Sequence, residues 1–259
     1  MPTVNIVPSM DVSMNSGGVF GQTNWNNAHD STSGSIPSDT HKGSDSAANI
    51  LGWFGNRVSN IFGTNYWRTK RVWFDIDVAS SVLAGATITS ATFNIKGRTF
   101  SAGFGKILGD TDLILVKGNY DSSSAATTQD IDAIAGFEAG WDDEDATTYS
   151  DELSEWVVSA DASGDYNEFT MTSDAITDMQ THLDAETKFQ FVMMEHSYDY
   201  NDVAPSNTSL VVEGNYFTIR ESNTSHRPYM AITYTTTAPA GVLTLNSGVL
   251  DITSGKLEL

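Results

Sequence analysis

Carboxylates are the side chains in this sequence with the greatest capacity for chemistry. The run Asp142-Asp143-Glu144-Asp145 concentrates oxygen ligands, and Asp110 and Asp112 form a D-x-D pair. Ca²⁺ takes about six to eight oxygen ligands from an ordered loop, whereas acidic runs more commonly form a solvated surface. Two interpretations stay open: a solvated acidic loop, or a structural calcium ion with ligands among Asp142, Asp143, Asp145, Asp110 and Asp112. No other cofactor is expected.

The arrangement of these residues does not favour catalysis. Two carboxylates can act as acid and base in a glycoside hydrolase, but among 33 Asp and Glu residues close pairs are expected, and no motif selects one. The five histidines lack zinc-ligand spacing, and His182 and His196 are expected to pack or to be exposed. There is no cysteine, serine elbow or Gly-rich phosphate loop. The sequence predicts a protein that is not an enzyme and that binds no zinc.

A cluster of aromatic residues is the best candidate for ligand binding. Trp and Tyr present flat apolar faces to sugar rings, and polar neighbours satisfy the hydroxyl groups. The predicted sugar platform consists of Trp53, Tyr66 and Trp67 flanked by Asn65 and Arg68. The alternatives are that these aromatics pack in the core or anchor a contact between subunits.

Charge excludes some partners. The formal net charge is −20, and residues 119–259 contain twenty-five Asp or Glu against four Lys or Arg. Such a field repels phosphate backbones and anionic lipids, so we expect no nucleic-acid or membrane partner. No segment has the roughly 20 apolar residues of a transmembrane helix, and Met1–Asp11 is not expected to be a secretory signal.

Alternating apolar residues predict an all-β protein. Val72, Phe74, Ile76 and Val78 have the period of a half-buried strand. A second alternation is expected to direct Ala91, Phe93 and Ile95 to one face and Ile88 to the other. Further strands are predicted in three segments, namely 3–7, 113–116 and 189–194.

Other segments predict loops and covering helices. Residues 13–48 are rich in Ser, Gly, Asn, Asp and Thr and predict one long loop. Ser150 is expected to cap a helix over 151–158, and Ser173 a helix over 174–183. TTTAPAG at 235–241 resembles a linker, which divides the chain into a body of about 1–236 and a tail of 237–259.

The tail repeats the unit L-x-[LI]-x-S-G-x every seven residues. Each unit supplies one very short strand and a Ser-Gly turn, and strands this short need a partner on which to stack. We therefore predict an assembly element that docks by strand addition, with a strand folded back on its own body as the alternative. Its apolar positions are Leu243, Leu245, Leu250, Ile252, Leu257 and Leu259.

Three segments resemble one known family. FDIDVASSVLAGATITSATFNI at 74–95, HSYDYNDVAPSNTS at 196–209 and HRPYMAITYTT at 226–236 are similar to segments of DNRLRE domains. These domains are jelly rolls similar to carbohydrate-binding modules, found in secreted multidomain proteins and in phage particles. The resemblance implies an antiparallel two-sheet jelly roll, to which the residue patterns above add one or two short covering helices and an extended C-terminal β tail.

These features together predict a structural surface protein of a virus particle, such as a capsid decoration, head fibre or tail-associated protein of a phage. Its partners would be other virion subunits, including copies of itself in a homo-oligomer such as a trimer, and its location the virion surface. The alternative is a carbohydrate-binding or adhesin module, and a virion protein could also bind a host glycan.

Overall fold

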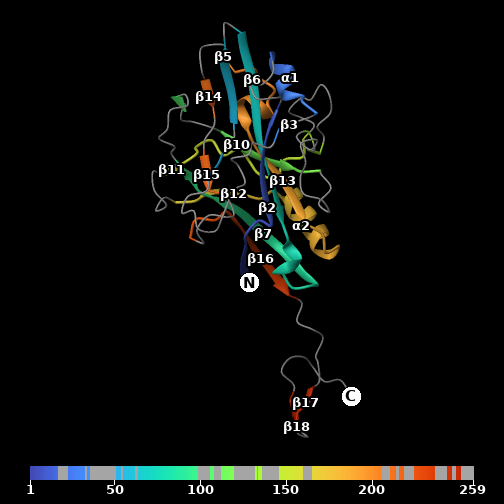
Figure 1. Ribbon diagram of the computed structural model, residues 1–259. Helices are drawn as coiled ribbons and strands as arrows, with labels where there is room; N and C mark the ends of the chain where they lie inside the picture. The colour runs from blue at the N-terminus through green and yellow to red at the C-terminus, as the bar shows by residue number, and fades with distance from the viewer. Residues whose placement is uncertain are drawn as a thin grey trace.

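β-strands dominate the described part of the chain (Figure 1). The computed structural model describes residues 1–16, 23–32, 34–35, 51–53, 55–61, 64–98, 106–107, 112–119, 132, 134–135, 146–159, 165–205, 211–213, 216–218, 225–236, 244–246 and 249–251. Two sheets provide most of the strands, as the sequence predicts for an all-β protein. No helix within these residues is long and apolar enough to cross a membrane.

The first sheet has four antiparallel strands. In spatial order they are β1 (Thr3–Ile6), β16 (Tyr229–Thr236), β7 (Ala86–Ile95) and β12 (Asn167–Thr170). The strand predicted at 3–7 is thus confirmed as β1, which pairs with the strand before the predicted linker.

The second sheet is built around the long strand β6 (Thr64–Ile76). One edge of β6 pairs with β13 (Phe189–Glu195) along 72–76 and with β5 (Gly55–Ile61) along 64–70. β2 (Met10–Ser16) occupies the other edge along 70–75 and also pairs with β3 (Gly34–Ser35). The sheet continues through β10 (Leu113–Lys117) beside β13, and through β14 (Val211–Glu213) and β9 (Lys106–Ile107) beyond β5.

Two smaller sheets complete the described strands. One contains β11 (Val158–Ser159), β8 (Gly97–Arg98), β15 (Tyr216–Thr218) and β4 (Leu51–Trp53). The other is a hairpin of β17 (Thr244–Asn246) and β18 (Val249–Asp251). In Figure 1 this hairpin lies apart from the two main sheets.

The main core lies between the two main sheets. Phe74 of β6, Phe93 of β7 and Phe191 of β13 are fully buried, with ring centroids 4.8–5.2 Å apart. A second apolar cluster covers the opposite face of the second sheet, and we call it the outer cluster. It consists of Trp73, Ile114, Val116, Ile134, Val192 and Met194. The two continuous apolar runs predicted as strands, β10 and β13, are buried on both faces for this reason.

Helix α2 (Ser173–Asp184) covers one end of the core with Ala175, Met179 and Leu183. It confirms the helix predicted over 174–183, but Thr172, not Ser173, is the cap. The Thr172 hydroxyl accepts a hydrogen bond from the backbone N–H of Ala175.

A bulge changes the predicted faces of β7. Thr233 pairs with Ser90 and Tyr234 pairs with Ile88, so Thr89 is an extra residue on β7. An extra residue shifts the alternation by one, and Ile88 is therefore buried on the same side as Ala91 and Phe93. The prediction that Ile88 faces away from them is wrong.

Two further predictions are wrong for identifiable reasons. The segment 13–48 is not one loop, because it contains the end of β2, β3 and the short helix α1 (Trp25–His29). Residues 17–22, 33 and 36–48 lie outside the described residues.

Residues 151–158 form no helix. Leu153 instead pairs with Leu113 at the edge of β10, and Ser150 accepts a hydrogen bond from the Leu115 N–H at 3.0 Å. Pairing the β10 edge outweighs the weak helical pattern.

We expect Phe93→Ala to lower the free energy of unfolding by about 3–5 kcal/mol, because it opens a cavity between the sheets. Urea denaturation would measure the loss. Thr87→Ala, an exposed position on the same strand, is the control and should change stability by no more than about 0.5 kcal/mol. Equal effects of the two substitutions would contradict this placement of the core.

Candidate functional site

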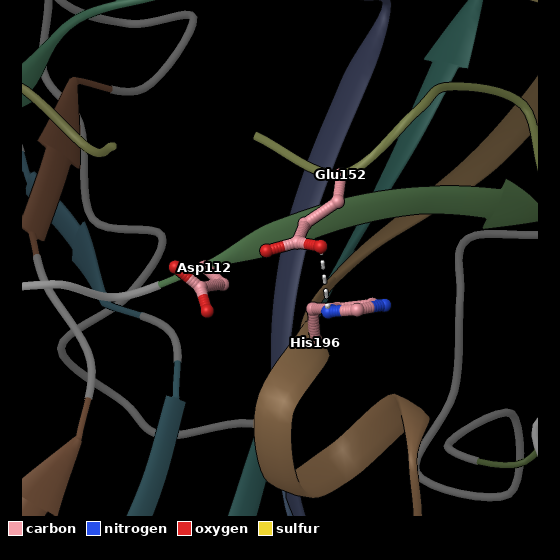
Figure 2. Close-up of side chains that lie close together, drawn as sticks. All are labelled: Asp112, Glu152 and His196. Atoms are coloured by element: carbon pink, nitrogen blue, oxygen red, sulfur yellow. Dashed lines mark ion pairs between the residues drawn. The ribbon is translucent and has the colours of Figure 1, made fainter. Parts of the chain in front are cut away.

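Asp112, Glu152 and His196 converge on the outer face of the second sheet (Figure 2). We call them the three-residue cluster. One potential ligand atom from each side chain lies within 4.8 Å of the other two. The Nδ1 atom of His196 is 3.5 Å from a carboxylate oxygen of Glu152. Among the described residues this is the group of His, Asp and Glu side chains best arranged to hold a metal ion.

The strand register explains why these residues meet. Leu113 of β10 pairs with Glu195 of β13 on one side and with Leu153 on the other. His196 continues this ladder by donating its backbone N–H to the carbonyl of Asp112 at 2.9 Å. Leu113 and Leu153 contact the main core, so Asp112 and Glu152, one residue before each of them, point to the outer face. His196 follows the same alternation from Met194.

Local contacts orient two of the three side chains. The Ser197 hydroxyl donates to the Asp112 carboxylate at 2.9 Å. The ring of Tyr200 stacks on the His196 imidazole with centroids 5.2 Å apart. Both contacts come from η2 (His196–Tyr200), a π-helical turn that follows β13 directly. π-helical turns are frequent at functional sites, and here the turn directs the imidazole towards Glu152.

Glu195 holds this turn in place. Its carboxylate accepts hydrogen bonds from the backbone N–H groups of Ser197, Tyr198 and Asp199 at 2.7–3.2 Å. Desolvation by burial raises the pKa of Glu195 to about 8, although these hydrogen bonds oppose the shift. Asp199 adds like-charge repulsion in the same direction as burial.

A buried ion pair joins η2 to β6 and α1. Arg71 donates two hydrogen bonds to the Asp199 carboxylate, at 3.0 and 2.8 Å, and a third to the backbone carbonyl of His29. Arg71, His29 and Asp199 are each at most 1% exposed. The His29 ring lies between the Asp199 carbonyl, 2.8 Å from Nε2, and the Asp30 carboxylate, 2.7 Å from Nδ1. These contacts satisfy buried charges, which makes the group structural.

A second charged group is also structural. Asp178 on α2 accepts hydrogen bonds from Tyr149 and pairs with Lys117 at 2.7 Å. Desolvation acts to raise the pKa of Asp178, but the contacts with Lys117 and Tyr149 outweigh it, and the pKa is lowered. Burial and the same carboxylate raise the pKa of Tyr149.

Only one of the calcium ligands predicted from sequence lies among the described residues. Asp112 belongs to the three-residue cluster, whereas Asp110, Asp142, Asp143 and Asp145 lie outside the described residues. The cluster's other members, Glu152 and His196, are absent from that prediction. No spacing in the sequence could identify them, because Glu152 lies in the segment that pairs with one edge of β10 and His196 follows β13 on the other edge.

The residues of the predicted sugar platform are spread over several surfaces. Asn65 to Arg68 are half-buried consecutive residues of β6, so Tyr66 and Arg68 point to one face and Asn65 and Trp67 to the other. Trp53 belongs to β4, in a different sheet, where it pairs with Tyr216. This placement gives the sugar platform no added support, and sugar binding stays a prediction.

Part of the predicted assembly tail is described. Leu245 of β17 and Leu250 of β18 are direct partners in the register of the hairpin. Leu243, Ile252, Leu257 and Leu259 lie outside the described residues.

Comparison with family models and with curated proteins gives no match. The resemblance to DNRLRE domains therefore stays a prediction.

We expect Asp199→Ala to cost about 3–5 kcal/mol of unfolding free energy, because it leaves the Arg71 guanidinium buried without its anion. Urea denaturation at neutral pH would measure this. Asp151→Ala removes an exposed carboxylate and should be nearly neutral. A cost for Asp199→Ala no larger than that for Asp151→Ala would show that the pair is not required for stability.

The Asp178 ion pair should make stability depend on pH. Because folding lowers the pKa of Asp178 below its ordinary value of 3.8, the pair's contribution is present above that value and disappears as pH falls through the folded-state pKa. Asp178→Asn should therefore destabilise the protein at pH 7, and its difference from the wild type should shrink under acid. Asp184→Asn on the same helix is the control. A difference between wild type and Asp178→Asn that stays constant with pH would refute this assignment.

Proposed function

We propose that this chain is a structural surface protein of a virus particle, such as a phage capsid decoration, head fibre or tail-associated protein. Its body would be a jelly roll, and its C-terminal strands would dock it to other subunits or to copies of itself. Two antiparallel sheets around the main core are compatible with a jelly roll. The order of strand pairing alone does not define the jelly-roll topology.

The C-terminal hairpin carries the proposal. β17 and β18 pair with each other and with no other strand in the described part of the chain. A hairpin of two three-residue strands has little stability in water by itself and leaves two strand edges unpaired. Such edges gain stability by adding to a sheet of another subunit. The seven-residue repeat, which extends past the hairpin to Leu259, would supply further strands of the same kind.

The body has properties that suit a particle surface. Strands far apart in the sequence pair directly, as β1 does with β16 and β2 with β6. Folds with such non-local pairing form slowly, and a high barrier to unfolding protects an exposed protein. The net charge of −20 would keep it soluble on a crowded surface.

Substitution within the hairpin tests the docking role. We expect Leu245→Asp/Leu250→Asp, like removal of Gly241–Leu259, to convert assemblies of the full chain to monomers in sedimentation velocity. Thr244→Asp/Asn246→Asp adds the same two charges at the polar positions of β17 and should retain assembly. Unchanged self-association and subunit docking after removal of Gly241–Leu259 would contradict the proposal that the tail docks the protein.

Copy number tests the virion role separately. Quantitative mass spectrometry of purified particles, relative to the major shell protein, should find this chain in a fixed ratio. A high ratio would indicate a capsid decoration, and a low ratio a fibre or tail component. Absence from particles would contradict the proposal and leave glycan binding as the first alternative.

A further inference from the structure

We propose that Asp112, Glu152 and His196 bind one divalent transition-metal ion of the zinc class. The inference concerns the outer face of the second sheet and is independent of the virion role. It also differs from the calcium interpretation of the sequence, because one of the three ligands is an imidazole.

The donor set determines the class of ion. Ca²⁺ prefers about six to eight oxygen ligands, and the three-residue cluster offers one nitrogen and the oxygens of two carboxylates. Imidazole nitrogen suits Zn²⁺ and its neighbours in the first transition series, which also accept carboxylate oxygen. Zn²⁺ is commonly held by three protein ligands with water in a fourth position. The cluster matches this pattern, with Nδ1 as the His196 atom that faces Glu152.

The distances are close to those that metal binding requires. Ligand atoms about 2.0–2.2 Å from a tetrahedral ion lie about 3.3–3.6 Å from one another. The His196 Nδ1 and a Glu152 oxygen are already 3.5 Å apart, and one ligand atom from each of the three side chains lies within 4.8 Å of the other two. The backbone around the three residues is tied by the pairings of their neighbours Leu113, Leu153 and Glu195, so the remaining gap would be closed by rotation of the side chains.

The charges in the cluster also favour a cation. Asp199 pairs with Arg71, Asp178 with Lys117 and Asp75 with Lys188. Among the ion pairs of the described residues, by contrast, Glu152 pairs with His196 alone, and Asp112 has no Lys or Arg partner. Two carboxylates brought together repel each other unless a cation lies between them. A divalent ion would neutralise both and leave the imidazole uncharged.

The surroundings resemble those of a preorganised metal site. Residues that hold a ligand by a second contact are a regular part of such sites, and their loss weakens binding by about 10–100-fold. Here Ser197 donates to Asp112, and Tyr200 stacks on the His196 ring. The Glu152 side chain is 39% exposed and that of His196 is 21% exposed, so an ion can enter from solvent.

Titration of the metal-stripped full-length protein tests the proposal. Co²⁺ should bind at one equivalent per chain and produce visible absorption bands typical of nitrogen–oxygen coordination. Zn²⁺ should displace the bound Co²⁺. We expect His196→Ala and Glu152→Gln each to weaken Zn²⁺ binding in calorimetry by at least about tenfold, the lower limit for outer contacts. Glu155→Gln, an exposed carboxylate in the same segment, should leave the affinity unchanged.

Two results would overturn the proposal. One is a Zn²⁺ affinity for His196→Ala and Glu152→Gln equal to that of Glu155→Gln, which would assign binding to the acidic surface in general. The other is displacement of Zn²⁺ by an equal concentration of Ca²⁺, which would exclude the imidazole as a ligand. Urea midpoints of the metal-free variants establish that they are folded, and Glu152→Gln, at an exposed side chain, keeps the test valid if His196→Ala is unstable.

Discussion

Burial of the second half of β6 on both faces is the constraint on which the rest of the structure depends. Every residue from Thr69 to Ile76 is buried. Val72, Phe74 and Ile76 enter the main core, while Arg71, Trp73 and Asp75 alternate with them on the other face. A buried charge is costly unless it is paired. The outer face therefore needs a cover that carries an anion, and η2 provides it with Asp199.

The same constraint determines the position of the three-residue cluster. Asp199 lies in η2 because Arg71 needs an anion at that point, and Glu195 caps the turn through three backbone N–H groups. His196 is the first residue of this turn, so its ring direction follows from the contacts that hold Ser197, Tyr198 and Asp199. A ligand held in this way loses little side-chain freedom on binding an ion. The stability of the Arg71–Asp199 pair and the geometry of the three-residue cluster are thus coupled through one short turn.

Sequence reasoning succeeded where one local signal dominated. Continuous apolar runs and clear alternation predicted β6, β7, β10 and β13, because strands that cross a core need apolar residues whatever their neighbours are. It failed where pairing decided the outcome. Residues 151–158 have a helical pattern, but Leu153 pairs with the edge of β10. The extra residue Thr89 in β7 reverses the face that period alone assigns to Ile88. Whether the tail docks, and whether the body is a jelly roll, depend on partners and connections that strand patterns do not specify.

Asp112 illustrates the limit most clearly. Along the chain its obvious neighbour is Asp110, and two carboxylates so spaced suggest oxygen-only ligation. In the fold its neighbours are Glu152 and His196, because β10 lies between β13 and the segment around Leu153. In a chain of net charge −20, any acidic surface attracts cations. Charge alone therefore cannot determine which cation binds at a given site. Selectivity comes from adding a single imidazole to two carboxylates at fixed geometry, and only the strand order of the second sheet brings these three side chains together.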